Sequence, residues 1–265
     1  MAMKVLAFVS LSGGQGKTTL SVLMGKYLER QGYTVLLIDG DPQSNLTTYL
    51  RHSVEKNEPT LSEVIQRTVP VSEAIYPTGE KNLFLLPSDD GLNKVQDYLA
   101  NSGFGATLLR QRLSGLPSGI DFCIIDSPPQ RSQLALTIIG AADYTVIPAE
   151  AVIKGYGSLV RTLDLFQQIK ENGSLAAEFL GVIPFRDKWV GLNRTQESRE
   201  AIAAMIEEVG EDKIFPSVRE SEQFKRAINH GKTLAEMGYP DLEYPFEVLA
   251  QTLGVDVKQS DLVGV

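Results

Sequence analysis

The chain has 265 residues, 43% of them hydrophobic, and a formal net charge of −8. This length and apolar content suffice for one large α/β domain with a substantial core, and they exclude a disordered protein. The acidic balance excludes a uniformly basic surface, so a nucleic-acid site has to be a local patch.

The cysteine usage and the N-terminal sequence indicate a cytoplasmic protein. The only cysteine, Cys123, lies in the apolar run 122–125, which is typical of a core thiol and not of a metal ligand. One cysteine cannot form an iron–sulfur site on its own chain. The chain starts directly with an apolar strand, without the basic and apolar regions of a signal peptide. No apolar run approaches the ~20 residues that a membrane span needs, so we expect a cytosolic chain. The acidic residues that flank the predicted last helix indicate no membrane partner.

A glycine-rich segment lies between the predicted strand 5–9 and the predicted helix 20–28. It consists of Ser12, Gly13, Gly14, Gln15, Gly16, Lys17, Thr18 and Thr19. Glycines allow backbone N–H groups to face phosphate oxygens, and the helix start adds its positive dipole end. Lys17 can reach the β- and γ-phosphates, and the Thr18 hydroxyl can bind Mg²⁺. The spacing departs from the standard P-loop, because Leu11 stands where the first glycine is expected.

Two acidic residues stand where predicted buried strands end. Asp39 follows the strand 34–38, and Asp126 follows the strand 121–125. The carboxyl ends of parallel strands form the ligand edge of an open α/β sheet. Asp126 can therefore hold the water shell of a Mg²⁺ ion. Asp41 can orient a water molecule for phosphoryl transfer; the alternative is that it only caps a helix or a turn.

The remaining segments alternate between apolar strands and amphipathic helices, which predicts a single doubly wound, mostly parallel sheet flanked by helices. We expect residues 1–265 to form one P-loop ATPase domain. The further expected elements are a helix over 61–67 after the capping box 60–63, a strand over 82–87, a broken helix over 93–113, a strand over 143–147, a loop over 149–157, a helix over 158–169, a strand over 179–183, and helices over 193–209, 221–230 and 244–253.

Three segments together resemble the nucleotide motifs of the ParA/MinD family, whose members are dimeric ATPases that position DNA or other cargo. They are 13–19 (GGQGKTT), 39–45 (DGDPQSN) and 126–129 (DSPP). The motifs occur in the family's order, and the resemblance extends from about residue 3 to about residue 254. It implies ATP and Mg²⁺ as cofactors, Asp41 as the residue that activates water, and Asp39 near the Mg²⁺ shell. It also places Pro184, Phe185 and Arg186 beside the adenine.

One position departs from the family pattern. Ser12 stands where the family has a signature lysine, which crosses the dimer interface and contacts the partner's nucleotide. Three alternatives are open. The chain binds nucleotide but hydrolyses it poorly, or it dimerises without a cation that reaches the partner's nucleotide, or another cation takes over the role of the signature lysine. Lys154, in the predicted loop with Gly155 and Gly157, is the candidate for that catalytic role; the alternative is an ordinary solvated lysine. Ser12 with intact other motifs also resembles the carboxysome-positioning (McdA) branch.

The resemblance implies that an ATP-bound homodimer binds DNA without sequence preference through basic residues late in the chain. The candidates in this sequence are Arg219, Lys225, Arg226 and Lys232, and the alternative is that they belong to solvated helix faces. Such a protein would associate with the nucleoid, and a ParB-like or McdB-like adaptor would stimulate its ATP hydrolysis. The competing hypotheses are a plasmid or chromosome partition ATPase, a MinD-like membrane-switched regulator, and a P-loop metabolic ligase or kinase. The acidic residues around the last helix disfavour the MinD-like regulator.

Overall fold

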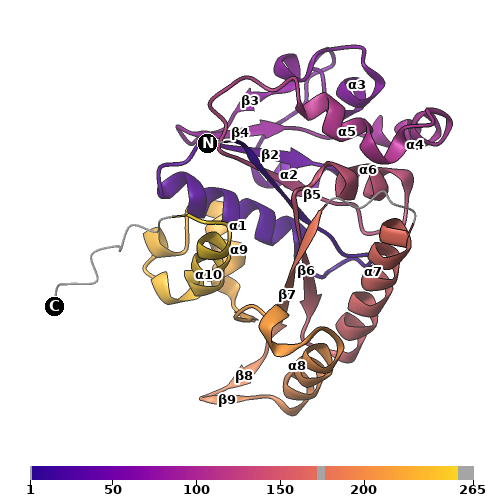
Figure 1. Cartoon of the computed structure of the whole chain (residues 1–265). Coiled ribbons are helices and arrows are strands. Elements are labelled where there is room, and N and C mark those ends of the chain that lie inside the picture. Colours follow the sequence, from indigo (N-terminus) through magenta and orange to yellow (C-terminus); the bar gives the residue numbers. More distant parts are fainter. Residues whose placement is uncertain (1, 172–176, 256–265) are drawn as a thin grey trace.

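A single eight-stranded sheet forms the centre of the computed structural model, which describes residues 2–171 and 177–255 (Figure 1). The strand order is β10-β7-β6-β1-β5-β2-β4-β3, and every pairing is parallel except the antiparallel pair β3–β4. The strands are β1 (Lys4–Phe8), β2 (Val35–Asp39), β3 (Tyr76–Pro77), β4 (Leu83–Leu86), β5 (Phe122–Asp126), β6 (Tyr144–Glu150), β7 (Glu178–Asp187) and β10 (Val218–Arg219). The predicted mostly parallel, doubly wound sheet is thereby confirmed.

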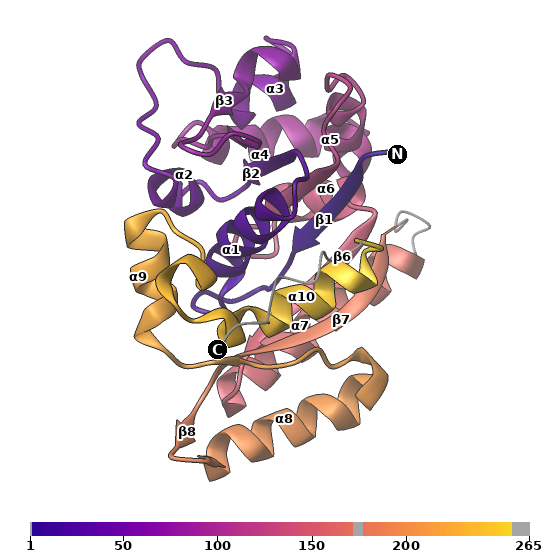
Figure 2. The ribbon, with the colours of Figure 1, turned by 90° about the vertical axis from the view of Figure 1, so that its left-hand side faces the viewer.

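Helices cover both faces of this sheet (Figures 1 and 2). One face carries α1 (Lys17–Arg30), α2 (Asn45–Tyr49), α9 (Glu222–His230) and α10 (Tyr244–Thr252). The opposite face carries α3 (Leu61–Gln66), α4 (Leu92–Asn101), α5 (Gly105–Leu113), α6 (Gln133–Ala141), α7 (Ile153–Glu171) and α8 (Gln196–Val209). Among the described residues, no helix combines the length and apolarity required to cross a bilayer.

The central strands are apolar throughout because both of their faces are covered. In β1, Val5 and Ala7 pack into one core and Leu6 and Phe8 into the other. A strand that is buried on both sides does not need the polar alternation of a half-exposed strand. These strands end together at one edge of the sheet, where the parallel register pairs Asp39 of β2 with Asp126 of β5.

Local sequence signals set several element boundaries as predicted. Thr60 and Glu63 form the predicted capping box at the start of α3. The predicted broken helix is α4 followed by α5, and the break falls at Gly103, whose φ of 70° is left-handed. These features confirm that capping and glycine signals position helix ends here.

The start of α7 corrects one prediction. The helix begins at Ile153, so Lys154 lies in its first turn and not in a loop. The two nearby glycines do not provide the expected backbone freedom. Gly155 instead permits close packing, because a Cβ atom on it would lie 1.9 Å from the carbonyl oxygen of Glu150. The helix therefore starts directly against the end of β6.

Two further boundaries differ from the prediction. The sixth predicted strand continues to Asp187, because β6 and β10 both pair with its last residues; Pro184, Phe185 and Arg186 therefore lie in β7 and not in a loop. The helix expected from residue 193 is preceded by a small hairpin, β8 (Trp189–Val190) and β9 (Asn193–Arg194). α8 then begins after Thr195, which caps it by accepting a hydrogen bond from the Ser198 backbone N–H.

Candidate active site

The glycine-rich segment forms the turn between β1 and α1, at the edge of the sheet where the parallel strands end. Gly14 and Gly16 adopt left-handed φ values of 81° and 96°, which glycine tolerates best. Gly16 is further constrained, because a Cβ atom on it would lie 2.7 Å from the ring of Phe185. Gly13 and Gly14 have open space around the position of a Cβ atom. The loop is therefore packed on one side and open on the other.

Lys17 is buried at the first position of α1 and folds back over this loop. Its Nζ donates a hydrogen bond to the carbonyl oxygen of Ser12 at 3.1 Å. Burial lowers the pKa of Lys17, and the nearby carboxylates of Asp126 and Asp41 oppose that shift. The Lys17 amine thus lies at the centre of the loop, where a P-loop lysine contacts phosphate.

Thr18 and Asp126 lie in direct contact. The Thr18 hydroxyl donates to Asp126 Oδ2 at 2.6 Å, and the other carboxylate oxygen, Oδ1, is buried without a hydrogen-bond partner among the described residues. The adjacent Ser127 hydroxyl is buried and unpartnered in the same way. A hydroxyl and a carboxylate with an unsatisfied buried oxygen fit the oxygen ligands and bound waters of a Mg²⁺ ion.

Asp39 has a different environment from Asp126, although the two are paired in register. Its Oδ2 accepts hydrogen bonds from the backbone N–H and the hydroxyl of Thr47, at 2.8 and 2.7 Å, and its Oδ1 accepts one from the Asp41 N–H at 3.2 Å. Burial raises the pKa of Asp39 to about 6. Asp39 therefore shapes the loop that carries Asp41, and it lies in the surroundings of the metal position without a free oxygen to offer.

Asp41 forms the turn considered from the sequence and leaves one carboxylate oxygen without a hydrogen bond from the described residues. Its Oδ1 accepts a hydrogen bond from the Gln43 backbone N–H at 3.0 Å, which is the expected turn. Its backbone oxygen accepts one from the Ser88 hydroxyl at 2.7 Å, which ties the loop to the end of β4. Among the described residues nothing donates to its Oδ2. The side chain is thus held in place with one oxygen available to a water molecule.

Gln15 holds the loop through its side chain. Its Oε1 accepts a hydrogen bond from the Glu150 backbone N–H at 2.8 Å, and its Nε2 donates to the Gly13 carbonyl oxygen at 3.3 Å. The side chain is 1% exposed. Of the predicted binding residues, Gln15 can therefore face a phosphate only with its backbone N–H.

A cavity of about 530 Å³ opens beside Thr19, next to the start of α1. Phe185 and Arg186 line it, whereas Pro184 lies within β7 opposite Ala149 and does not. Other walls of this cavity were not predicted, among them Tyr49 of α2 and Phe224, Ile228 and Asn229 of α9. No local motif marks these residues, because the cavity is assembled from segments far apart in the chain. The lining combines aromatic and apolar side chains with charged ones, and its aromatic part can pack against a nucleobase.

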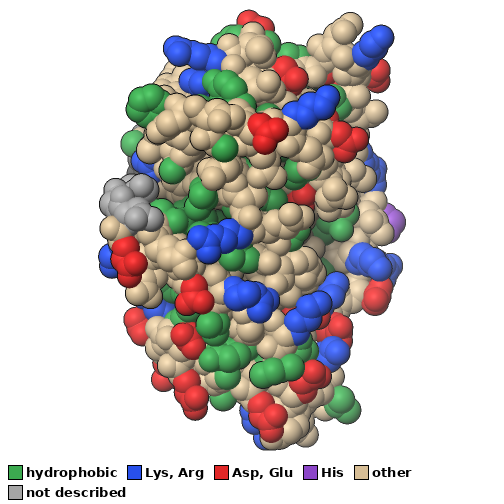
Figure 3. Space-filling view, turned by 90° about the vertical axis from the view of Figure 1, so that its right-hand side faces the viewer, with side chains coloured by type: hydrophobic (Ala, Val, Ile, Leu, Met, Phe, Trp, Pro, Cys, Tyr) green, Lys and Arg blue, Asp and Glu red, His purple; other side chains and the backbone are tan. Residues whose placement is uncertain are grey.

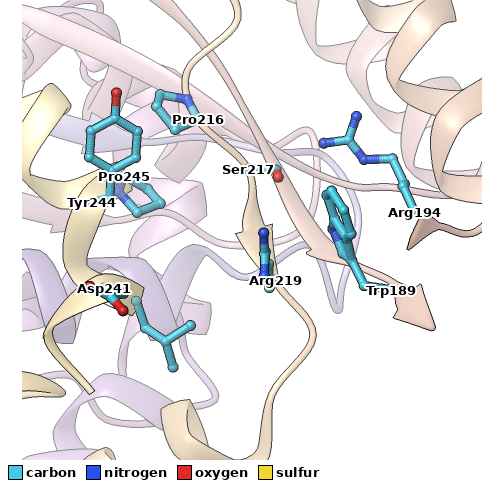
Figure 4. Close-up of a pocket in the computed structure, with 9 residues that line it drawn as sticks. Trp189, Arg194, Pro216, Ser217, Arg219, Asp241, Tyr244 and Pro245 are labelled. Carbon is cyan, nitrogen blue, oxygen red and sulfur yellow. The ribbon is translucent and has the colours of Figure 1, made fainter. Parts of the chain in front are cut away.

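The four candidate DNA-binding residues are all exposed, but they have two kinds of surroundings. Arg219 and Lys225 also line the cavity beside Thr19, whereas Arg226 and Lys232 do not. Arg219 stacks on Trp189 with its guanidinium 4.4 Å from the ring centroid, and Arg194 lies on the other side of the indole (Figure 4). This cluster lines a second cavity of about 430 Å³, against the start of α10.

Lys154 is exposed in the first turn of α7, next to Ile153, which is 74% exposed. Among the described residues it forms no ion pair. Lys and Arg side chains gather across the middle of the molecular face that carries α7 (Figure 3). Lys154 is therefore free to contact a group outside its own subunit.

Substituting Asp126 by asparagine is expected to raise the melting temperature of the metal-free protein at pH 8 by several degrees. Burial and the neighbouring Asp39 raise the pKa of Asp126 to about 8. The folded state therefore binds more protons than the unfolded state between about pH 4 and pH 8, and stability falls as the pH rises through this window. Thermal unfolding with EDTA at pH 5 and pH 8 measures this effect. A larger stabilisation by Asp126→Asn at pH 5 than at pH 8 would contradict the assignment.

The fold and this site define a P-loop nucleotide-binding protein: a glycine turn before a helix, a buried lysine, and a Thr–Asp pair at the ligand edge of a parallel sheet. Comparison with known proteins agrees. The family model of an AAA domain matches residues 3–176. The chain is 53% identical to maintenance of carboxysome distribution protein A from Gloeothece citriformis, over 96% of this chain and 98% of that protein.

Two solved structures extend the comparison. An aspartate-to-alanine variant of McdA from Cyanothece, in complex with ATP, is 51% identical and superposes with a TM-score of 0.93 over 99% of both chains. Cobyrinic acid a,c-diamide synthase from Mycobacterium smegmatis, with a bound ATP analogue and magnesium, is 27% identical with a TM-score of 0.76, over 95% of this chain and 96% of that one. The chain therefore belongs to the ParA/MinD family of P-loop ATPases, and within it to the McdA group.

Proposed function

We propose that the chain is a single-domain ATPase that closes into a homodimer on ATP, binds DNA without sequence preference and positions carboxysomes. The observation that carries the ATPase activity in this proposal is the Thr18–Asp126 pair with its free buried oxygen, placed beside the buried Lys17; the dimer, DNA binding and the cargo are proposed from the family. A P-loop needs this combination to bind ATP with Mg²⁺ and to stabilise the transferred phosphoryl group.

Each residue of the site has a role in this mechanism. Thr18 and Asp126 would hold a Mg²⁺ ion, which would neutralise phosphate charge. Lys17 and the backbone N–H groups of residues 13–19 bind the phosphate oxygens and orient the triphosphate. Asp41 offers its free oxygen to the attacking water. Phe185 and Arg186 hold the base in the cavity beside Thr19.

The cargo is proposed from the relatives. Near-complete coverage at 53% identity to a carboxysome distribution protein supports the same cargo for this chain. In this account the ATP-bound dimer associates with the nucleoid in the cytoplasm, and a McdB-like or ParB-like adaptor on the cargo stimulates hydrolysis. Hydrolysis then opens the interface between the two subunits, and the protein returns to the monomer.

Phosphate release from ATP tests the proposed activity. The purified chain is expected to release phosphate slowly with Mg²⁺ and not with EDTA, and faster when the adaptor and DNA are added. The Lys17→Ala variant provides the background rate, because it lacks the charge at the centre of the loop. Release that equals this background under all of these conditions would contradict the proposed function.

The similarity to cobyrinic acid a,c-diamide synthase supports a second candidate function, a metabolic ligase that uses the same loop. The cations beside the P-loop, Arg186, Arg219 and Lys225, line the cavity assigned here to the nucleotide, so a metabolite would have to share that cavity. ATP turnover that depends on an added small carboxylic acid, and not on DNA or an adaptor, would favour the ligase.

The double substitution Arg226→Ala/Lys232→Ala is expected to weaken ATP-dependent DNA binding several-fold at moderate salt while leaving ATP affinity unchanged. Both residues are exposed and lie outside the nucleotide cavity. Each lost phosphate contact reduces the slope of log affinity against log salt concentration by about one. Fluorescence anisotropy of a labelled duplex across a salt series measures both effects. DNA binding of equal strength without nucleotide would argue against an ATP-controlled site.

A further inference from the structure

Residues 10–12, which connect β1 to the first glycine of the P-loop, are held by one face of α7. Three consecutive residues of the loop each form a hydrogen bond to this helix. The bonds are Ser10 Oγ with Ser158 Oγ (3.0 Å), Leu11 N to Thr162 Oγ1 (3.2 Å) and Arg161 Nη2 to Ser12 Oγ (3.1 Å). The three helix residues are spaced i, i+3 and i+4, so they share one face. Each of the residues 10–12, which precede the glycines of the P-loop, is therefore held by a hydrogen bond to α7.

The bond between Arg161 and Ser12 differs from the other two, because its donor is charged. Within residues 2–171 and 177–255, Arg161 forms no ion pair with a carboxylate. Ser12 in turn accepts a hydrogen bond from Lys17 through its carbonyl oxygen. Ser12 thus connects the exposed guanidinium of α7 with the buried ammonium of the P-loop.

We propose that Arg161 is a positioning residue of the nucleotide site: it holds Ser12, and through Ser12 the P-loop, in the shape that receives the triphosphate. It also brings a positive charge to residue 12, from a different element of the same subunit. This inference rests on the proposed function only in that ATP binds at this loop. The Arg161–Ser12 contact is the one contact of the three with a charged donor, and it is exposed to solvent, whereas the Ser10 and Leu11 contacts are buried or part-buried.

The same helix links this contact to the second subunit in the proposed dimer. Lys154 precedes Arg161 by seven residues, which places both on one side of α7. The start of the helix is fixed to β6 by the close packing of Gly155. The residue that holds Ser12 and the lysine that faces outward are therefore carried by one helix whose start is fixed.

A double-mutant cycle tests the proposal with Arg161→Ala, Ser12→Ala and the double variant. Arg199→Ala is the matched control, because Arg199 is an exposed arginine that donates one hydrogen bond to a backbone oxygen far from the site. The first measurement is hydrogen–deuterium exchange of residues 11–16 without nucleotide. The second is ATP affinity, and melting temperatures verify that each variant folds.

We expect each single variant to raise exchange in residues 11–16 and to weaken ATP binding about three- to tenfold. The double variant should bind ATP no more weakly than the single variant with the lower ATP affinity, because both changes remove the same contact. Arg161→Lys keeps a cation and a donor and should restore most of the affinity. Additive effects, or exchange in Arg161→Ala that equals the Arg199→Ala control, would overturn the proposal. If the wild-type protein binds no ATP, the proposed function fails, and the exchange measurement still decides the role of Arg161.

Discussion

Substituting Asp41 by asparagine is expected to reduce ATP hydrolysis by about 100-fold or more and to leave ATP bound. The carboxylate keeps one oxygen free of hydrogen bonds from the described residues, while its other oxygen holds the turn to Gln43. An asparagine side chain can keep that turn, because its oxygen also accepts the hydrogen bond. It cannot offer the second acceptor and the negative charge that orient a water molecule.

Two measurements separate hydrolysis from binding in this variant. Phosphate release should fall to the background rate, and ATP affinity should stay within about threefold of the wild-type value. Asp164→Asn, an exposed change on α7, is the matched control and should leave both values unchanged. Hydrolysis by Asp41→Asn at more than about a tenth of the wild-type rate would show that another group orients the water.

Lys154→Ala is expected to abolish ATP-induced dimers while the monomer still binds nucleotide. The lysine is exposed in the first turn of α7 and forms no ion pair among the residues that the structure describes. In the closed dimer its ammonium would lie against the partner's phosphates, where a desolvated cation is strongly stabilising. Removing the Lys154 ammonium leaves the phosphate charge at the dimer interface without a counter-charge.

Sedimentation velocity with ATP and Mg²⁺ measures this effect directly. The wild-type protein should sediment as a dimer and Lys154→Ala as a monomer. Lys170→Ala, an exposed lysine in the last turn of the same helix, should still dimerise. Normal ATP-dependent dimerisation of Lys154→Ala would show that Lys154 is not required at the partner's phosphates. It would favour a dimer that closes without a cation in trans.

The parts of the molecule that the sequence predicted well depend on local signals. The apolar run before Gly13 and the run before Asp126 predict strands buried on both faces, and their carboxyl ends meet at one edge of the sheet. The capping box at Thr60 and the glycine break at Gly103 likewise act within a few residues. The glycine loop, the placement of Thr18 and Asp126 at the ligand edge and the mostly parallel topology follow from such signals.

Contacts between distant segments were not predictable in this way. The cavity beside Thr19 joins residues of α2, β7 and α9, and none of these segments carries a motif for it. The contact of Arg161 with Ser12 joins residues 149 positions apart. The prediction of a loop around Lys154 was wrong, because glycine usually marks a turn, whereas Gly155 here permits helix-to-strand packing.

The most direct measurement is a crystal structure of the Asp41→Asn variant grown with ATP and Mg²⁺. The account predicts the triphosphate against the backbone N–H groups of residues 13–19 and the metal between Thr18 and the free oxygen of Asp126. It also predicts the base in the cavity lined by Phe185, and a second subunit closed over the nucleotide. A nucleotide bound elsewhere, or an empty glycine loop at saturating ATP, would contradict it.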